Sequence, residues 1–310
     1  MRVFVAGATG AIGRPLVRQL VEVGHEVTGT TRSEARAEEI RAAGATPAVC
    51  DALDAGALRA AVEAAQPDVV VHELTDLPAE WSMRTSYGST GRLRSEGGRN
   101  LVEAAKAAGA RRVVAQSIAF VYEPAGGPVK DEEAPTMTPG SGAFAEALER
   151  TFELERVVTG TNGIEGIVLR YGFFYGPGTW YAPGTKLTEQ VRRRRVPIVG
   201  EGGGLFSFIH VDDAASATVA ALDHGAPGIY NIVDDDPASM RDWVSLYAEA
   251  IGAPPPRRVP LWLAKLLSST NAGMATALRG ASNAKARREL GWEPRHPSWR
   301  DGFRAVLAPG

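Results

Sequence analysis

Chemistry is most readily assigned to a glycine-rich run near the start of the chain, Gly7-Ala8-Thr9-Gly10-Ala11-Ile12-Gly13. The run follows an apolar stretch, Arg2–Ala6, and precedes a stretch typical of a helix. Its three glycines suit a tight turn, a close approach of the backbone to a pyrophosphate, and close packing of the helix on the strand. The first N–H groups of the helix would face the phosphates. The run therefore predicts a dinucleotide-binding site.

Arg32 bears on which dinucleotide binds. It follows Thr31, where the second predicted strand ends, and Arg36 lies one turn further on. A site for NAD usually has an acidic residue here, which binds the ribose 2′-hydroxyl, whereas an arginine accommodates the 2′-phosphate of NADP. The carboxylates of Glu34 and Glu38 fall past the strand end. We expect NADPH as the cofactor, with NADH less favoured.

Asp51 follows the third predicted strand and is placed to face the adenine. The alternative is a helix cap, because aspartate side chains accept hydrogen bonds from the first N–H groups of a helix. Both Asp51 and Asp54 qualify for that structural role. The sequence leaves the choice between the two roles open.

Strands and helices alternate through the first half of the chain. Short β-rich runs predict strands at Arg2–Ala6, Glu26–Thr31, Pro47–Cys50, Asp68–His72, Arg112–Ser117 and Ile164–Arg170. Helices are predicted between them, at Arg14–Val23, Arg36–Ala43, Ala55–Ala64 and Leu101–Ala108. This alternation implies right-handed crossovers and a parallel sheet that is covered on both faces. We therefore predict an α/β fold with a Rossmann-type doubly wound parallel sheet.

The pattern loosens after Arg170, where prolines become frequent. Helices are predicted there at Lys186–Arg195, Asp212–Leu222, Met240–Ile251 and Asn283–Leu290. We expect residues 1–170 to form the NADP-binding domain, with some later segments returning to it. Residues 171–310 are expected to form a smaller C-terminal part that binds the substrate and closes over the sheet.

Composition excludes several classes of protein. The 310 residues carry a net charge of −2, with 44% hydrophobic and 23% charged residues, so no nucleic-acid surface is indicated. A single cysteine, Cys50, allows no internal disulfide. No apolar run is long enough to span a membrane, and the five histidines show no metal-binding spacing. We expect a cytoplasmic monomer or homodimer with no metal, membrane or nucleic-acid partner.

Nearly the whole chain resembles the extended short-chain dehydrogenases/reductases. Besides the glycine run, the resemblance rests on the segments Asn100–Ala105, Val121-Tyr122, Arg170–Pro177, Phe208–Asp213, Tyr230–Ile232 and Leu290–Pro294. Overall, the chain is similar to the atypical ketoreductases of actinobacterial aromatic polyketide pathways, including those that act on angucyclinones.

The active site that this resemblance implies is absent. The family uses a Ser or Thr with a Tyr-x-x-x-Lys pair, whose lysine lowers the pKa of the tyrosine that protonates the product alkoxide. No lysine of this chain has a tyrosine four residues earlier, and Gly142–Arg150, where the pair should fall, holds no tyrosine. The family's serine and asparagine positions fall on Ile118 and Arg94. We expect no catalytic residue from the family set, and Ser117 is the one remaining candidate.

The motifs and the resemblance together predict the ligand contacts. The expected contacts with the dinucleotide are Gly7, Thr9, Gly10, Ala11, Ile12, Gly13, Arg32, Asp51, Ala52, Leu74, Gln116, Tyr171 and Phe173. The expected contacts with the substrate are Met83, Tyr122, Phe174, Trp180 and Tyr181. The aromatic members of the second group suit a flat aromatic substrate, although aromatic residues more often belong to the core.

Three functions remain open on these grounds. The favoured one is an NADPH-dependent ketoreductase that acts on a polycyclic aromatic, angucyclinone-like carbonyl, with the proton supplied by the substrate or by water. The second is a non-catalytic dinucleotide-binding redox sensor or scaffold. The third is a nucleotide-sugar epimerase or dehydratase, against which the missing tyrosine counts because these enzymes need it as a base.

Overall fold

The structure is a computed structural model that describes residues 1–77, 88–140 and 142–308. A seven-stranded sheet with the order β12-β7-β5-β4-β1-β2-β3 forms its centre, and all neighbouring strands in it are parallel. Its strands are β1 (Arg2–Ala6), β2 (Glu26–Thr31), β3 (Thr46–Val49), β4 (Val69–His72), β5 (Arg112–Ile118), β7 (Glu165–Tyr171) and β12 (Gly228–Ile232). The predicted Rossmann-type doubly wound sheet is confirmed. The strand order reverses between β1 and β4, and ligands of such sheets bind beside this switch point.

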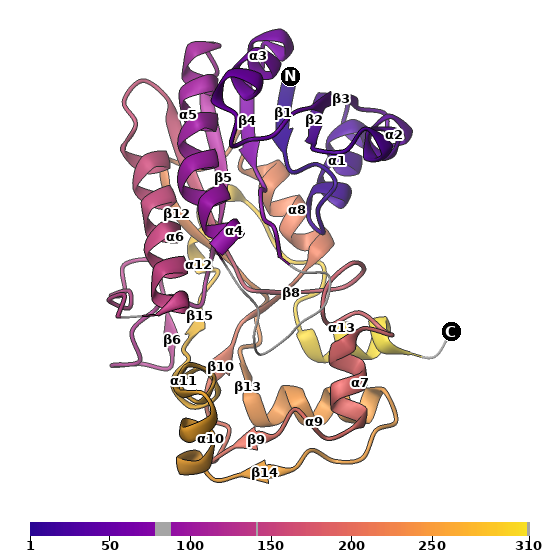
Figure 1. The fold of residues 1–310 in the computed structure, drawn as a ribbon, viewed down its shortest axis with the longest axis vertical. Coiled ribbons are helices and arrows are strands. Elements are labelled where there is room, and N and C mark those ends of the chain that lie inside the picture. Colours follow the sequence, from indigo (N-terminus) through magenta and orange to yellow (C-terminus); the bar gives the residue numbers. More distant parts are fainter. Residues whose placement is uncertain (78–87, 141, 309–310) are drawn as a thin grey trace.

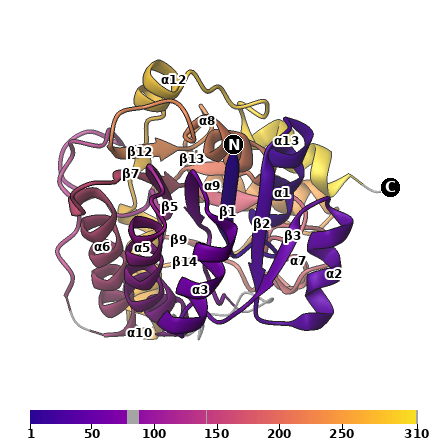
Figure 2. The ribbon, with the colours of Figure 1, turned by 90° about the horizontal axis from the view of Figure 1, so that it is seen from above.

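Helices cover both faces of the sheet (Figure 2). One face is covered by α1 (Gly13–Glu22), α2 (Glu34–Ala42), α8 (Val211–Ala220) and α12 (Ala284–Leu290). The other face is covered by α3 (Ala55–Ala65), α5 (Gly98–Ala107) and α6 (Ala143–Gly160). Strand β4 shows why its sequence is apolar without alternation: Val69 and Val71 pack on the first face, and Val70 packs on the second.

The segments after β7 gather at the carboxyl ends of the strands, in the lower half of Figure 1, and only some of them return to the sheet. Their short strands are β8 (Phe173–Tyr175), β9 (Ile198–Val199), β10 (Leu205–Phe206), β11 (Phe208–His210), β13 (Ala238–Ser239), β14 (Arg258–Val259) and β15 (Gly280–Ala281), the last of which pairs with β6 (Val129–Lys130). Their remaining helices are α7 (Lys186–Arg192), α9 (Met240–Ala250), α10 (Leu261–Leu267), α11 (Ser269–Ala277) and α13 (Trp299–Leu307). Within the described ranges, no helix is long and apolar enough to cross a membrane.

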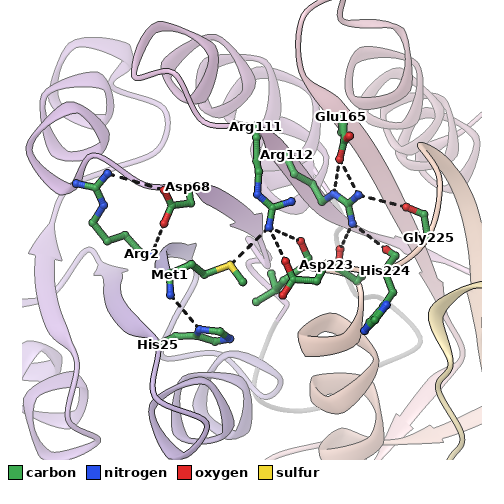
Figure 3. Close-up of polar contacts among 12 residues, drawn as sticks. Met1, Arg2, His25, Asp68, Arg111, Arg112, Glu165, Asp223, His224 and Gly225 are labelled. Carbon is green, nitrogen blue, oxygen red and sulfur yellow. Dashed lines mark hydrogen bonds and ion pairs between the residues drawn. The ribbon is translucent and has the colours of Figure 1, made fainter.

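Ion pairs close the amino-terminal edge of the sheet (Figure 3). Arg112, at the start of β5, donates to Glu165 at the start of β7 over 2.8 and 2.6 Å and to the carbonyl of His224 over 2.8 Å. Its neighbour Arg111 donates to Asp223 over 2.6 Å. These contacts hold the loop after α8 against the sheet. The charged groups at this edge therefore stabilise the fold. Ligands of such sheets bind at the opposite edge, at the carboxyl ends of the strands.

A buried ion pair fixes helix α6 to the sheet. Arg170 of β7 donates to both carboxylate oxygens of Glu155, over 2.8 and 2.6 Å, and both side chains are about 95% buried. Ser117 of β5 donates to the same carboxylate over 2.6 Å. Two strands and the helix are thus joined by one charged group, in an interior where ions without partners are costly.

We expect Glu155→Ala to destabilise the protein by about 3–5 kcal/mol, because it leaves Arg170 buried without its carboxylate. Urea unfolding at pH 7 measures the change. The matched control is Glu149→Ala at an exposed position of the same helix, which should stay within about 0.5 kcal/mol of the wild type. A loss below about 1 kcal/mol for Glu155→Ala would show that the pair does not hold the helix.

Candidate functional site

The glycine turn connects β1 to α1 at the switch point of the sheet. Gly7 has a φ of +95°, and a Cβ atom built there would lie 2.5 Å from the carbonyl oxygen of Glu73. A Cβ atom at Gly13 would lie 2.2 Å from the carbonyl oxygen of Gly7. Neither position can carry a side chain, as the sequence predicts. No side chain caps the N-terminus of α1, and the N–H groups of Ile12 and Gly13 have no backbone partner among the described residues, so they are available to a phosphate.

Two arginines lie beside this turn. Arg36 donates to the carbonyl of Thr9, and Arg32 lies 3.2 Å from the carboxylate of Asp76, which follows β4. The Arg32–Asp76 pair is about half exposed, so it contributes at most about 1 kcal/mol and opens at little cost. A 2′-phosphate could replace Asp76 as the partner of Arg32. The turn and the two arginines therefore fit a phosphorylated dinucleotide.

Asp51 and Asp54 have different roles. Asp54 caps α3 by accepting from the N–H groups of Gly56 and Ala57, each over 3.0 Å. Asp51 accepts from the N–H of Leu53 over 2.9 Å and stays exposed. The helix cap is therefore Asp54, and Asp51 keeps one carboxylate oxygen for which the structure shows no protein partner among the described residues.

The remaining predicted contacts with the dinucleotide lie at the carboxyl edge of the sheet. Ala52 and Leu74 approach the same glycine, since a Cβ atom at Gly97 would lie 3.6 and 3.7 Å from their side chains. Gln116 is buried near the end of β5. Phe173 stacks on Phe120 at 4.4 Å between ring centroids. Tyr171 is buried and hydrogen-bonded to Thr218 over 2.6 Å, so the structure gives it a core position.

Glu73 is a residue of this site that the sequence analysis missed. It follows β4 at the switch point, is 4% exposed, and has one carboxyl oxygen with no partner among the described residues. Burial raises the pKa of Glu73 to about 8, although a hydrogen bond from Tyr171 opposes this. The carboxyl group is therefore neutral at pH 7 and does not repel a pyrophosphate at the adjacent turn. A carboxylate directly after the buried strand Val69–His72 is the sequence signal for it.

The region that should hold a proton donor has none on α6. This helix contains neither tyrosine nor lysine. The hydroxyl of Ser117 is directed into the sheet–helix interface, where it donates to Glu155. Tyr122 is 2% exposed, and its hydroxyl donates to Asn231 over 2.6 Å while it accepts from Arg170. Both hydroxyl groups are thus committed to buried structural contacts.

A buried cation lies in the same region. Arg94 belongs to the π-helical turn η1 (Leu93–Gly97), which joins α4 (Gly88–Arg92) to α5. Its Nη1 donates to the hydroxyl of Thr151 on α6 over 2.8 Å, and its Nε has no partner among the described residues. Burial lowers the pKa of Arg94 to about 10, so the guanidinium stays charged at pH 7.

The predicted substrate contacts separate into different environments. Tyr181 lies in an aromatic core, with its ring centroid 5.3 Å from that of Phe208 and 5.7 Å from that of Trp243. Phe174 and Trp180 are half-buried. Met83 lies outside the described residues. Within the described ranges, no group of three or more His, Cys, Asp or Glu side chains is arranged to hold a metal ion.

Comparison with known proteins places this geometry in context. The model of the NAD dependent epimerase/dehydratase family matches residues 3–233. A 3-diazoavenalumate denitrifying reductase of Streptomyces sp is 48% identical over 98% of this chain and 99% of its own. A 4-hydroxy-2-methyl-3-oxo-4-farnesyl-3,4-dihydroquinoline-1-oxide ketoreductase of Stigmatella aurantiaca is 28% identical over 81% of this chain and 74% of its own. The structure of a UDP-glucose 4-epimerase from Thermotoga maritima has a TM-score of 0.78 at 19% identity, covering 99% of this chain and 97% of its own, and shows the shared fold.

The raised pKa of Glu73 predicts how stability depends on pH. Between the ordinary value of 4.5 and about 8, the folded protein holds a proton that the unfolded chain has lost. The contribution of Glu73 to the free energy of unfolding therefore falls by about 1.4 kcal/mol per pH unit across this window. Glu73→Gln lacks this loss, so it should gain stability relative to the wild type by about 2–4 kcal/mol from pH 5 to pH 8.

Urea unfolding at pH 5, 6.5 and 8 measures this difference. The control Glu149→Gln, at an exposed position of α6, should differ from the wild type by the same amount at every pH. If the difference for Glu73→Gln is also constant with pH, the carboxyl group is ionised in the folded protein and this account of it is wrong.

Proposed function

Because the chain belongs to the NAD dependent epimerase/dehydratase family, we propose that it is an NADPH-dependent reductase that removes the diazo group of an aromatic substrate as dinitrogen. One observation carries the proposal: α6 has neither the tyrosine nor the lysine that would protonate an alkoxide. The hydroxyls of Ser117 and Tyr122 are committed to buried partners. The reaction that fits such a site is one that needs no acid.

Reduction of a diazo group meets this condition, and reduction of a ketone does not. A ketone that accepts hydride becomes a strongly basic alkoxide, which must then take a proton. A ring carbon that bears a diazo group forms its new C–H bond with the hydride pair, while the C–N bond breaks and its electrons leave with N2. An aryl diazonium ion and hydride thus give a neutral arene and dinitrogen. No proton enters the balance.

The residues of the chain supply binding and orientation. The glycine turn and the N-terminus of α1 would hold the pyrophosphate, and Arg32 and Arg36 would hold the 2′-phosphate. When bound, the reduced nicotinamide supplies the hydride. The half-buried rings of Phe174 and Trp180 offer apolar surface to an aromatic substrate. The Streptomyces relative supports the choice of substrate, because its name describes denitrifying reduction of a diazo compound and its similarity extends over both whole chains.

A ketoreductase that acts on a polycyclic aromatic carbonyl is the second candidate. It would need a substrate hydroxyl beside the carbonyl, or water, to supply the proton. The Stigmatella aurantiaca relative favours it, because that protein is named as a ketoreductase of a quinoline. Sugar epimerisation is less well supported, since it needs a tyrosine base and α6 contains no tyrosine.

Turnover assays separate these candidates. We expect the protein to oxidise one NADPH and release one N2 for each molecule of 3-diazoavenalumate or of a diazotised aminohydroxybenzoate. Absorbance at the nicotinamide band and mass spectrometry of the headspace gas measure the two quantities. A panel of hydroxylated anthraquinones should not be reduced. Reduction of the anthraquinones alone would establish the ketoreductase instead, and NADPH binding with no turnover of any substrate would indicate a sensor or scaffold.

Arg32→Ala tests the choice of dinucleotide. The substitution removes the cation expected to bind the 2′-phosphate, so the Kd for NADPH should rise about tenfold or more, while the Kd for NADH stays within about twofold. Fluorescence titration of both cofactors measures the constants. The control Arg193→Ala removes an exposed arginine of similar type that pairs with Glu189 on the neighbouring turn. Equal weakening of both cofactors by Arg32→Ala would refute the preference for NADPH.

A further inference from the structure

Arg94 is a buried cation with few polar contacts. It is 8% exposed, and the side-chain hydrogen bond that it makes among the described residues goes to a neutral hydroxyl, that of Thr151. Its Nε has no partner there, and no ion pair within 4 Å joins it to a described carboxylate. The negative charge of Glu155 favours the guanidinium from farther away, but that carboxylate is bound directly to Arg170. A buried cation without a directly bound carboxylate is unfavourable, whereas an apolar residue of similar volume would be neutral or stabilising. Such a group points to an anionic ligand.

The guanidinium lies at the edge of the sheet where ligands bind. Thr151 precedes Glu155 by four residues, which is about 6 Å along the helix toward its N-terminus. Glu155 is level with Ser117, near the carboxyl end of β5. On the other side, the carbonyl of Leu93 lies 3.3 Å from the ring of His72, the last residue of β4. Arg94 therefore reaches the space between α6 and the carboxyl ends of β4 and β5.

The neighbouring positions on α6 hold small side chains. The residue one turn before Thr151 on α6 is Ala147, whose carbonyl accepts from the Thr151 hydroxyl over 2.8 Å. Both positions thus hold small residues, and α6 has neither a tyrosine nor a lysine. The cation comes from η1, a π-helical turn, and such turns occur frequently at functional sites.

We propose that Arg94 binds the ring oxygen of a diazophenol, and that this oxygen defines the substrate class. The inference rests on the proposed function and specifies it. In a phenol with the diazo group ortho or para to the oxygen, the two groups are conjugated. As hydride forms the C–H bond and N2 leaves, the oxygen acquires the full negative charge of a phenolate. The guanidinium stabilises that charge without giving up a proton. The step balances, because a diazophenolate with no net charge and one hydride give one phenolate and one N2.

Paired substrates test the assignment. Arg94→Met keeps an unbranched apolar stem and removes the guanidinium, and it should fold because no carboxylate is bound directly to the replaced ion. We expect kcat/KM to fall about 100-fold with a diazotised aminohydroxybenzoate. With a diazotised aminobenzoate, which lacks the hydroxyl, the change should be less than about threefold. Arg94→Lys should restore part of the activity on the first substrate.

The control variant is Arg92→Met, two residues away, where an exposed arginine pairs with Glu96. It should leave both substrates unaffected. The Kd for NADPH should be the same in all variants, because the proposed contact is with the substrate. Equal losses on both substrates, or no loss with Arg94→Met, would overturn the assignment.

A binding measurement gives a second readout that does not depend on turnover. 4-Nitrophenol, a chromogenic phenol, should bind as the phenolate, so its yellow band should persist at lower pH with the wild type than in free solution. Arg94→Met should abolish this effect. If the wild type reduces no diazo compound, the proposed function has failed, and this titration still decides whether Arg94 binds a phenolate. Binding of the neutral phenol by the wild type would overturn the assignment.

Discussion

The arrangement of the proposed substrate site, at the carboxyl edge of the sheet, depends on the buried ion pair between Glu155 and Arg170. It joins α6 to β7, and the bond from Ser117 joins the same carboxylate to β5. With Glu155 fixed at the end of β5, the preceding turn of α6 must project beyond the sheet. That turn carries Thr151, which receives Arg94 from η1. One ion pair thus sets the position of a second cation that has no carboxylate of its own.

The cofactor end and the substrate end of the proposed site differ in charge because they have different functions. Beside the glycine turn, the carboxyl group of Glu73 is held neutral by burial, and no side chain caps the N-terminus of α1. At the end of α6, a cation is present but a proton donor is not. Hydride transfer to the diazo carbon of a diazophenolate leaves negative charge on the ring oxygen, which a cation can stabilise, and it needs no acid. The arrangement is therefore consistent with the proposed diazo reduction. It need not be explained as a ketoreductase site that has lost its tyrosine and lysine.

The sequence predicted the strands of the first half within one residue at each end, because strands buried on both faces are apolar runs bounded by glycine, proline or polar residues. It missed β12 and α6, whose places depend on partners far along the chain. Glu73 and Arg94 could not be identified as buried charges, since burial is a property of the assembled fold. Tyr122 and Tyr181 were expected at the substrate, but composition alone does not separate a core aromatic residue from one in a binding site.

The central claim is that hydride alone completes the reaction at the ring carbon. The most direct test uses NADPH deuterated at both C4 positions in ordinary water, followed by NMR and mass spectrometry of the product from a diazotised aminohydroxybenzoate. One deuterium is expected at the carbon that carried the diazo group, and none at that carbon when unlabelled NADPH is used in D2O. Deuterium from the solvent at that carbon would show that a proton, and not the hydride, forms the new C–H bond.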